Sequence, residues 1–129
     1  MLILVYILIG IFVGFLGMQF LVLLRSKRNR GKCVEQINGK IGKMMMVGGK
    51  SMVYFYSPGC RACKYQTPII DRLISLGHMI QKVDISRDIS TARKFGVMAT
   101  PTTVVLNGNE IIEFMVGAKT EDKLRNYLI

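Results

Sequence analysis

Residues 54–64 read Tyr-Phe-Tyr-Ser-Pro-Gly-Cys-Arg-Ala-Cys-Lys, an aromatic run that ends at Pro-Gly and leads into two cysteines. The aromatic and aliphatic density of residues 52–56 predicts a buried strand. The Ser-Pro-Gly that follows supplies the turn that ends the strand. Beyond the second cysteine, apolar residues recur at steps of three and four, which predicts a helix with one buried face over residues 60–76. Cys60 is therefore expected in the first turn of that helix.

The two cysteines are three residues apart at this expected helix start. The thiolate, rather than the thiol, is the nucleophile, and the unpaired N–H groups at a helix start stabilise negative charge. Arg61 and Lys64 add positive charge within reach. Cys63 would lie on the same helix face, partly shielded, where it can attack a mixed disulfide formed at Cys60 and release the substrate. The pair is a candidate redox couple.

Two other interpretations of the cysteine spacing stay open. The C-x-x-C spacing supplies half of many zinc sites, but the further sulfur and imidazole groups, Cys33 and His78, form no second ligand pair. A purely structural disulfide across two intervening residues would gain little from chain entropy. We expect no metal and no cofactor, since two sulfurs carry both electrons of a disulfide exchange.

The first 24 residues contain no charged side chain, which predicts a transmembrane anchor. At ~1.5 Å per residue, such a helix crosses a ~30 Å hydrocarbon core with some tilt. A cleaved signal peptide is the alternative, but no basic segment precedes the apolar stretch and residues 25–30 make a poor cleavage site. Gly10, Gly14 and Gly17 are spaced to share one helix face, which allows a dimer through that face.

Most of the net charge of +10 lies beside the anchor, where residues 25–50 carry eight Lys and Arg against one acid. The positive-inside rule then places residues 25–129 in the cytoplasm, and the charge predicts contact with anionic lipid headgroups. Nucleic acid is not an expected partner, because no aromatic interleaving or binding motif accompanies the basic residues. We divide the chain into an anchor (1–24), a basic juxtamembrane linker leading into a short helix or strand (25–47), and a domain (48–129). For Cys33, lipidation, an intermolecular disulfide and no role are all open.

The remaining chain predicts a small α/β unit. A strong hairpin signal, Asn107-Gly108, separates two apolar runs. Asp88 and Thr120 are placed to cap helices. The elements expected after the cysteine helix are strands over 79–83, 102–106 and 111–116 and helices over 88–95 and 121–129.

Over residues 48–129, the order of elements and the local motifs together resemble the thioredoxin family. Residues 56–64 are similar to its active-site motif, and Pro68 matches the proline that kinks the active-site helix. Residues 95–102 resemble the segment with the family's cis-proline. Gly117 matches a glycine that lets a substrate chain approach.

The resemblance implies a thioredoxin-like α/β fold with a mixed sheet of about four strands. Strands 52–56 and 79–83 would be parallel, and the hairpin antiparallel. Helices 60–76 and 121–129 would cover the faces of the sheet, and the amino-terminal part of the family fold would be abbreviated.

The resemblance also implies site roles. Cys60 would be the attacking thiol, Cys63 the resolving thiol, and Pro101 a cis residue packed against the disulfide. The backbone of Thr100 would pair with a substrate peptide like an added strand.

The sequence departs from the family pattern at three places. Gly59 stands where the family often has tryptophan, and Tyr54 replaces a buried acid, although Lys82 matches a lysine usually found near that acid. Arg61 and Ala62 replace Gly-Pro. A cation there should favour the thiolate, and hence the reduced form, so that the disulfide becomes a better oxidant.

The leading hypothesis is a membrane-anchored thiol–disulfide oxidoreductase that exchanges disulfides with protein partners. A rival is a non-catalytic binding or assembly module that holds a membrane partner by strand pairing, and a metal carrier is third. Because many membrane-tethered relatives work on the oxidising side of a membrane, the periplasmic or extracytoplasmic side is the alternative to the cytoplasm.

Overall fold

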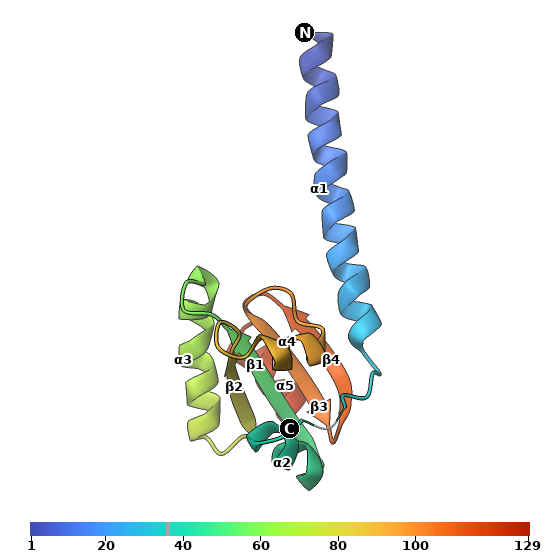
Figure 1. The fold of residues 1–129 in the computed structure, drawn as a ribbon. Coiled ribbons are helices and arrows are strands. Elements are labelled where there is room, and N and C mark those ends of the chain that lie inside the picture. Colours follow the sequence, from blue (N-terminus) through green and yellow to red (C-terminus); the bar gives the residue numbers. More distant parts are fainter. Residues whose placement is uncertain (36) are drawn as a thin grey trace.

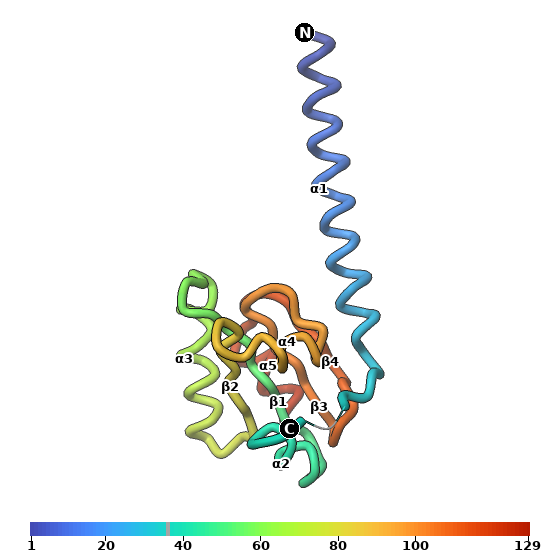
Figure 2. The backbone as a smooth tube through the Cα atoms, in the orientation of Figure 1, coloured from blue at the N-terminus to red at the C-terminus, as the bar shows by residue number. Residues whose placement is uncertain are grey.

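A long helix projects from a four-stranded α/β unit in the computed structural model, which describes residues 1–35 and 37–129 (Figure 1). The backbone trace gives the same arrangement (Figure 2). The elements in chain order are α1 (Leu2–Asn29), α2 (Lys40–Val47), β1 (Lys50–Tyr56), α3 (Arg61–Ser75), β2 (Ile80–Asp84), α4 (Ile89–Phe95), β3 (Thr102–Asn107), β4 (Glu110–Val116) and α5 (Glu121–Leu128).

The sheet has the strand order β2-β1-β3-β4. β1 is parallel to β2 and antiparallel to β3, and β3 is antiparallel to β4. These directions confirm the predicted mixed sheet. Because Phe55 near the end of β1 pairs with Thr102 at the start of β3, the segments that follow β1 and precede β3 meet at one edge of the sheet.

Side chains of β1 alternate between two buried layers. Val53 and Phe55 point into the layer covered by α2 and α4, whereas Met52 and Tyr54 point into the layer covered by α3 and α5. The four side chains are fully buried. β1 is therefore fixed from both faces, and with it the loop that leads to Cys60.

The structure differs from the expected linker between residues 25 and 47. α1 continues past Leu24 to Asn29, because Lys and Arg are good helix formers. The chain then runs along β4: Gly31 N–H donates to Ile111 O at 2.7 Å, and Val34 N–H donates to Asn109 O at 2.9 Å.

The same segment contributes to the core. Its buried apolar residues join the layer that contains Val53 and Phe55, and they are Val34, Ile37, Ile41, Met44 and Met45. Where a short helix or strand was expected, the structure has the helix α2. The abbreviated amino-terminal part thus covers a face of the sheet that would otherwise expose apolar side chains.

α1 is long and apolar enough to span a membrane, and its apolar stretch is not buried against the rest of the protein. No charged residue interrupts it before Arg25. It is therefore a candidate membrane span.

Candidate active site

Cys60 and Cys63 lie where β1 leads into α3. Cys60 is the N-cap residue of α3, so the helix begins at Arg61, one residue later than the sequence pattern indicated. Its sulfur accepts a hydrogen bond from the Cys63 N–H at 3.1 Å, which is the role that an N-cap side-chain oxygen usually has. Negative charge on this sulfur would face the positive end of the helix dipole.

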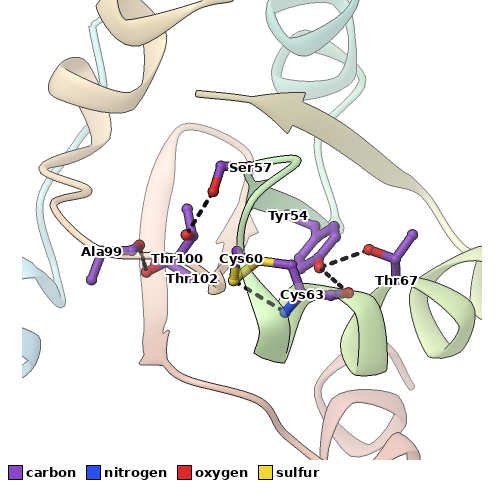
Figure 3. The surroundings of a disulfide bond; sticks show 8 residues. All are labelled: Tyr54, Ser57, Cys60, Cys63, Thr67, Ala99, Thr100 and Thr102. Atoms are coloured by element: carbon purple, nitrogen blue, oxygen red, sulfur yellow. Dashed lines mark hydrogen bonds between the residues drawn. A yellow bond between two sulfur atoms is a disulfide. The ribbon is translucent and has the colours of Figure 1, made fainter. Parts of the chain in front are cut away.

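The two cysteines form a disulfide, with their Cα atoms 5.2 Å apart (Figure 3). Their exposure differs. Cys60 is partly exposed, whereas Cys63 is 2% exposed. Of the two cysteines, Cys60 is therefore the one open to attack by a partner the size of a protein.

A second loop meets the disulfide loop at the same edge of the sheet (Figure 3). The Thr100–Pro101 peptide bond in this loop is cis, which confirms the conformation implied by the resemblance, and Pro101 is buried. The hydroxyls of Ser57 and Thr100 lie 3.2 Å apart and join the two loops. Thr102 Oγ1 donates to Ala99 O at 2.7 Å and closes the second loop on itself.

A third loop follows β4. Gly117 N–H donates to Pro101 O at 2.8 Å, and Gly117 has a φ of 87°, a left-handed conformation that favours glycine. Lys119 N–H donates to the buried side chain of Gln66 on α3 at 2.5 Å. These bonds hold the loop against both the cis-proline segment and the active-site helix.

Tyr54 lies close to Cys63 in the layer behind the disulfide (Figure 3). Its hydroxyl is 3.0 Å from Thr67 Oγ1 and 3.4 Å from Cys63 O. Burial raises the pKa of Tyr54 above its ordinary value, although the hydrogen bond with Thr67 opposes this. The hydroxyl therefore stays protonated at neutral pH and supplies a neutral dipole, not a charge.

The other residues proposed from the sequence lie around this centre. Lys82 is opposite Tyr54 on β2, and its Nζ pairs with Asp71 Oδ1 on α3 at 2.6 Å. Gly59, Arg61 and Ala62 are exposed. Among the described residues Arg61 forms no ion pair, so its charge is not neutralised by a neighbour.

Sequence reasoning did not identify Ser57, Gln66 and Thr67 as site residues. Thr67 carried one signal, because it lies one helical turn after Cys63 and so shares its face. Ser57 carried none, since its partner is 43 residues away in the chain. Within the part of the chain that the structure describes, no group of three or more His, Cys, Asp or Glu is placed to hold a metal ion.

Comparison with known proteins identifies the fold and the family. The family model described as Thioredoxin matches residues 35–129. Thioredoxin from Bacillus subtilis (strain 168) is 34% identical over 80 residues, which cover 60% of this chain and 77% of the relative. Thioredoxin from Streptomyces clavuligerus is 33% identical over 75 residues, which cover 57% of this chain and 70% of the relative.

Solved structures agree with this assignment. A mutant thioredoxin from Halobacterium salinarum NRC-1 aligns with a TM-score of 0.65 at 23% identity, covers 72% of this chain with 83% of its own, and shows the shared fold. Thioredoxin from Fasciola hepatica aligns with a TM-score of 0.57 at 28% identity, covering 63% and 79%. Since the family model spans most of the chain, this protein belongs to the thioredoxin family and is a thiol–disulfide oxidoreductase.

Proposed function

We propose that this protein is a membrane-anchored thiol–disulfide oxidoreductase whose Cys60–Cys63 pair exchanges disulfides with protein partners. The observation that carries the proposal is the unequal exposure of the two cysteines. Cys60 is accessible at the start of α3, and Cys63 is 2% exposed. A substrate sulfur thus meets Cys60 first, and Cys63 is reserved for the intramolecular step.

The exchange needs no group beyond four sulfurs. In the reducing direction, the Cys60 thiolate attacks a substrate disulfide and expels one substrate sulfur as a thiolate. The Cys63 thiolate then attacks the Cys60 sulfur, forms the Cys60–Cys63 bond and expels the second substrate sulfur. Two electrons pass to the substrate, and its two thiolates take up protons. The oxidising direction is the same sequence reversed.

We assign substrate docking to the backbone beside the cis-proline. Thr100 is partly exposed at the edge of the sheet, where an extended substrate chain can pair with it. The exposed Gly59 and Ala62 leave room for that chain beside Cys60. Gly117 has no side chain to obstruct this chain, and the buried Pro101 would pack against the disulfide.

We assign the anchor to residues 1–24. Their charge-free sequence continues without a break into the basic end of α1, where Arg25, Lys27 and Arg28 would meet anionic headgroups. The catalytic unit includes residues 31–47, because Val34 and Met44 are buried in its core. By the positive-inside rule, this unit is cytoplasmic.

The anchor also offers a surface for pairing with a second copy. A Cβ added at Gly10, Gly14 or Gly17 would meet no described atom within 4 Å, so this face of α1 is open to a close helix contact.

Substitution of each cysteine tests the exchange. We expect Cys60→Ser to abolish turnover of a protein disulfide, and Cys63→Ser to accumulate mixed disulfides that appear on non-reducing gels. Cys33→Ser is the matched control and should retain turnover. Wild-type turnover by Cys60→Ser would show that the roles are assigned wrongly. Full cellular function of the Cys60→Ser, Cys63→Ser double variant would support the non-catalytic module instead.

A further inference from the structure

The end of the catalytic unit that carries the disulfide is the end from which α1 projects (Figure 1). The last turns of α1 lie along β4, where Val22, Ser26 and Arg30 line one pocket together with Glu113 and Val116. β4 runs toward the active-site edge, since Gly117, immediately after it, bonds to Pro101. The apolar part of α1 therefore leaves the domain past its active-site edge.

A buried carboxylate holds this arrangement. Glu113 on β4 has a side chain only 7% exposed and binds Arg30 through two bonds, Nε to Oε1 at 2.9 Å and an NH2 group to Oε2 at 2.6 Å. Tyr127 on α5 donates its hydroxyl proton to Glu113 Oε2 at 2.9 Å. Two-point contact between a guanidinium and a carboxylate restricts orientation as well as distance. We call these three residues the clamp.

The chain on either side of Arg30 is also fixed. Asn29 is 4% exposed and packs against Gly96, where an added Cβ would lie 3.2 Å from Asn29 Nδ2. Ile111 on β4 exchanges backbone hydrogen bonds with Gly31 and Lys32 at 2.7 and 2.9 Å. The clamp is thus flanked by direct contacts on both sides, with no free linker between helix and sheet.

The surface at this end suits a lipid headgroup layer. The three loops of the active site, residues 57–64, 96–102 and 116–120, form part of it and contain three basic residues and no acid. The loop after β2 lies at the same end, since Ile85 N–H donates to Tyr56 O, and it adds Arg87 and Asp88. Met98, in the loop over residues 96–102, is 69% exposed. Cationic and apolar groups together are the combination that an anionic membrane surface attracts.

We infer that the substrates are cysteines of integral membrane proteins that lie at the headgroup layer on the side of the catalytic unit. This inference rests on the proposed function, since it requires α1 to be embedded and Cys60 to exchange disulfides. The clamp directs Cys60 and the cis-proline edge toward the bilayer. A membrane protein with a disulfide close to the lipid surface meets that edge directly, whereas a disulfide far from the surface does not.

The orientation is tested with fluorescent probes on the full chain in liposomes. In a background of Cys33→Ser, Cys60→Ser and Cys63→Ser, a fluorophore is attached after Met98→Cys or, as the matched control, after Met46→Cys. Both methionines are exposed, by 69% and 82%, but Met46 lies on α2, at the opposite end of β1. Headgroup-level spin-labelled lipid should quench the probe at position 98 several-fold more than the probe at position 46. Equal quenching at both positions would overturn the inference.

The substrate class is tested with two single-span peptides in liposomes with the wild-type chain. One carries its disulfide next to the membrane, and the other carries it beyond a long flexible linker. We expect the near disulfide to be exchanged about tenfold faster, because the fixed domain raises its effective concentration at Cys60. Arg30→Gln and Glu113→Gln should bring the two rates together and leave the rate with a small soluble disulfide unchanged. Arg30→Gln keeps the bond between Glu113 and Tyr127, which guards against a folding defect.

The outcomes separate the two proposals. A wild-type chain that exchanges the small disulfide but favours the far peptide contradicts the inference alone. A wild-type chain that exchanges no disulfide contradicts the proposed function, and the probe measurement still decides the orientation.

Discussion

Arg61 is adjacent to the sulfur that a substrate meets, and it is exposed without an ion-pair partner among the described residues. We expect its charge to stabilise the Cys60 thiolate, and therefore the reduced state of the couple, more than the disulfide. Solvent weakens the interaction. A contribution of about 0.5 kcal/mol corresponds to about 10 mV for two electrons.

The variant Arg61→Gln should therefore lower the midpoint potential by about 10 mV. The measurement is a redox titration in a buffered thiol series, with Arg93→Gln on the exposed face of α4 as the control. A higher potential in Arg61→Gln would contradict this account of the site.

Tyr54 differs from Arg61 because it is buried and neutral. Replacing it with Phe removes the hydroxyl and leaves Thr67 Oγ1 without this partner, so we expect the free energy of unfolding to fall by about 1 kcal/mol. Because burial raises the pKa of Tyr54, the hydroxyl does not titrate near neutral pH, and the pH profile of turnover should keep its shape. Tyr65 is 72% exposed, and Tyr65→Phe is the control. Loss of one limb of the pH profile in Tyr54→Phe would show that the hydroxyl transfers a proton.

Among single residues, the sequence predicted those features of the site that short local motifs specify. The disulfide pair and the cis bond before Pro101 belong to short motifs, and the structure contains both. The contact between Ser57 and Thr100 joins two such motifs across the fold. A contact of this kind depends on strand register, which short-range patterns do not encode.

Among the elements, the strands and helices of residues 50–129 match the expected ones to within two residues, because each combines a clear period with a turn or cap signal. The segment before β1 is different. Its glycines and lysines favoured a tether, yet its apolar residues are buried. Their spacing is too irregular to indicate a helix face, and only the open face of the sheet explains their burial.

Asp88 caps the N-terminus of α4. Asp88 Oδ1 accepts from the Thr91 N–H at 3.1 Å, and hydrogen bonds from the Thr91 side chain and backbone lower the pKa of Asp88. Because the pKa of Asp88 is lower in the folded state, the cap stabilises the folded protein fully above the unfolded-state pKa of about 3.9. This stabilisation is lost as the pH falls through the pKa of the folded state. Asp88→Ala should cost about 1 kcal/mol at neutral pH and progressively less in acid.

The loss of unfolding free energy in Asp88→Ala is measured by urea unfolding of the full chain in detergent, at neutral and at acidic pH. Asp88→Asn is the matched control, because it retains a capping oxygen without a titrating group. If Asp88→Ala lost the same free energy of unfolding at both pH values, the charge of Asp88 would not contribute to the cap.

For the whole molecule, sequence indicated an anchor, a linker and a domain in succession. The structure joins the first and last directly, because Arg30 at the end of α1 binds Glu113, 83 residues later. An acid in the middle of a strand gave no sign of this partner. The joint fixes which way Cys60 faces relative to α1, the candidate membrane span.

The central claim is that Cys60 and Cys63 form a reversible redox couple in the anchored protein. The most direct test is a redox titration of the full chain in liposomes, with Cys33→Ser, that follows alkylation of Cys60 and Cys63 by mass spectrometry. We expect one reversible two-electron transition, with a midpoint less negative than about −270 mV because of Arg61. The absence of any reversible two-electron transition would contradict it.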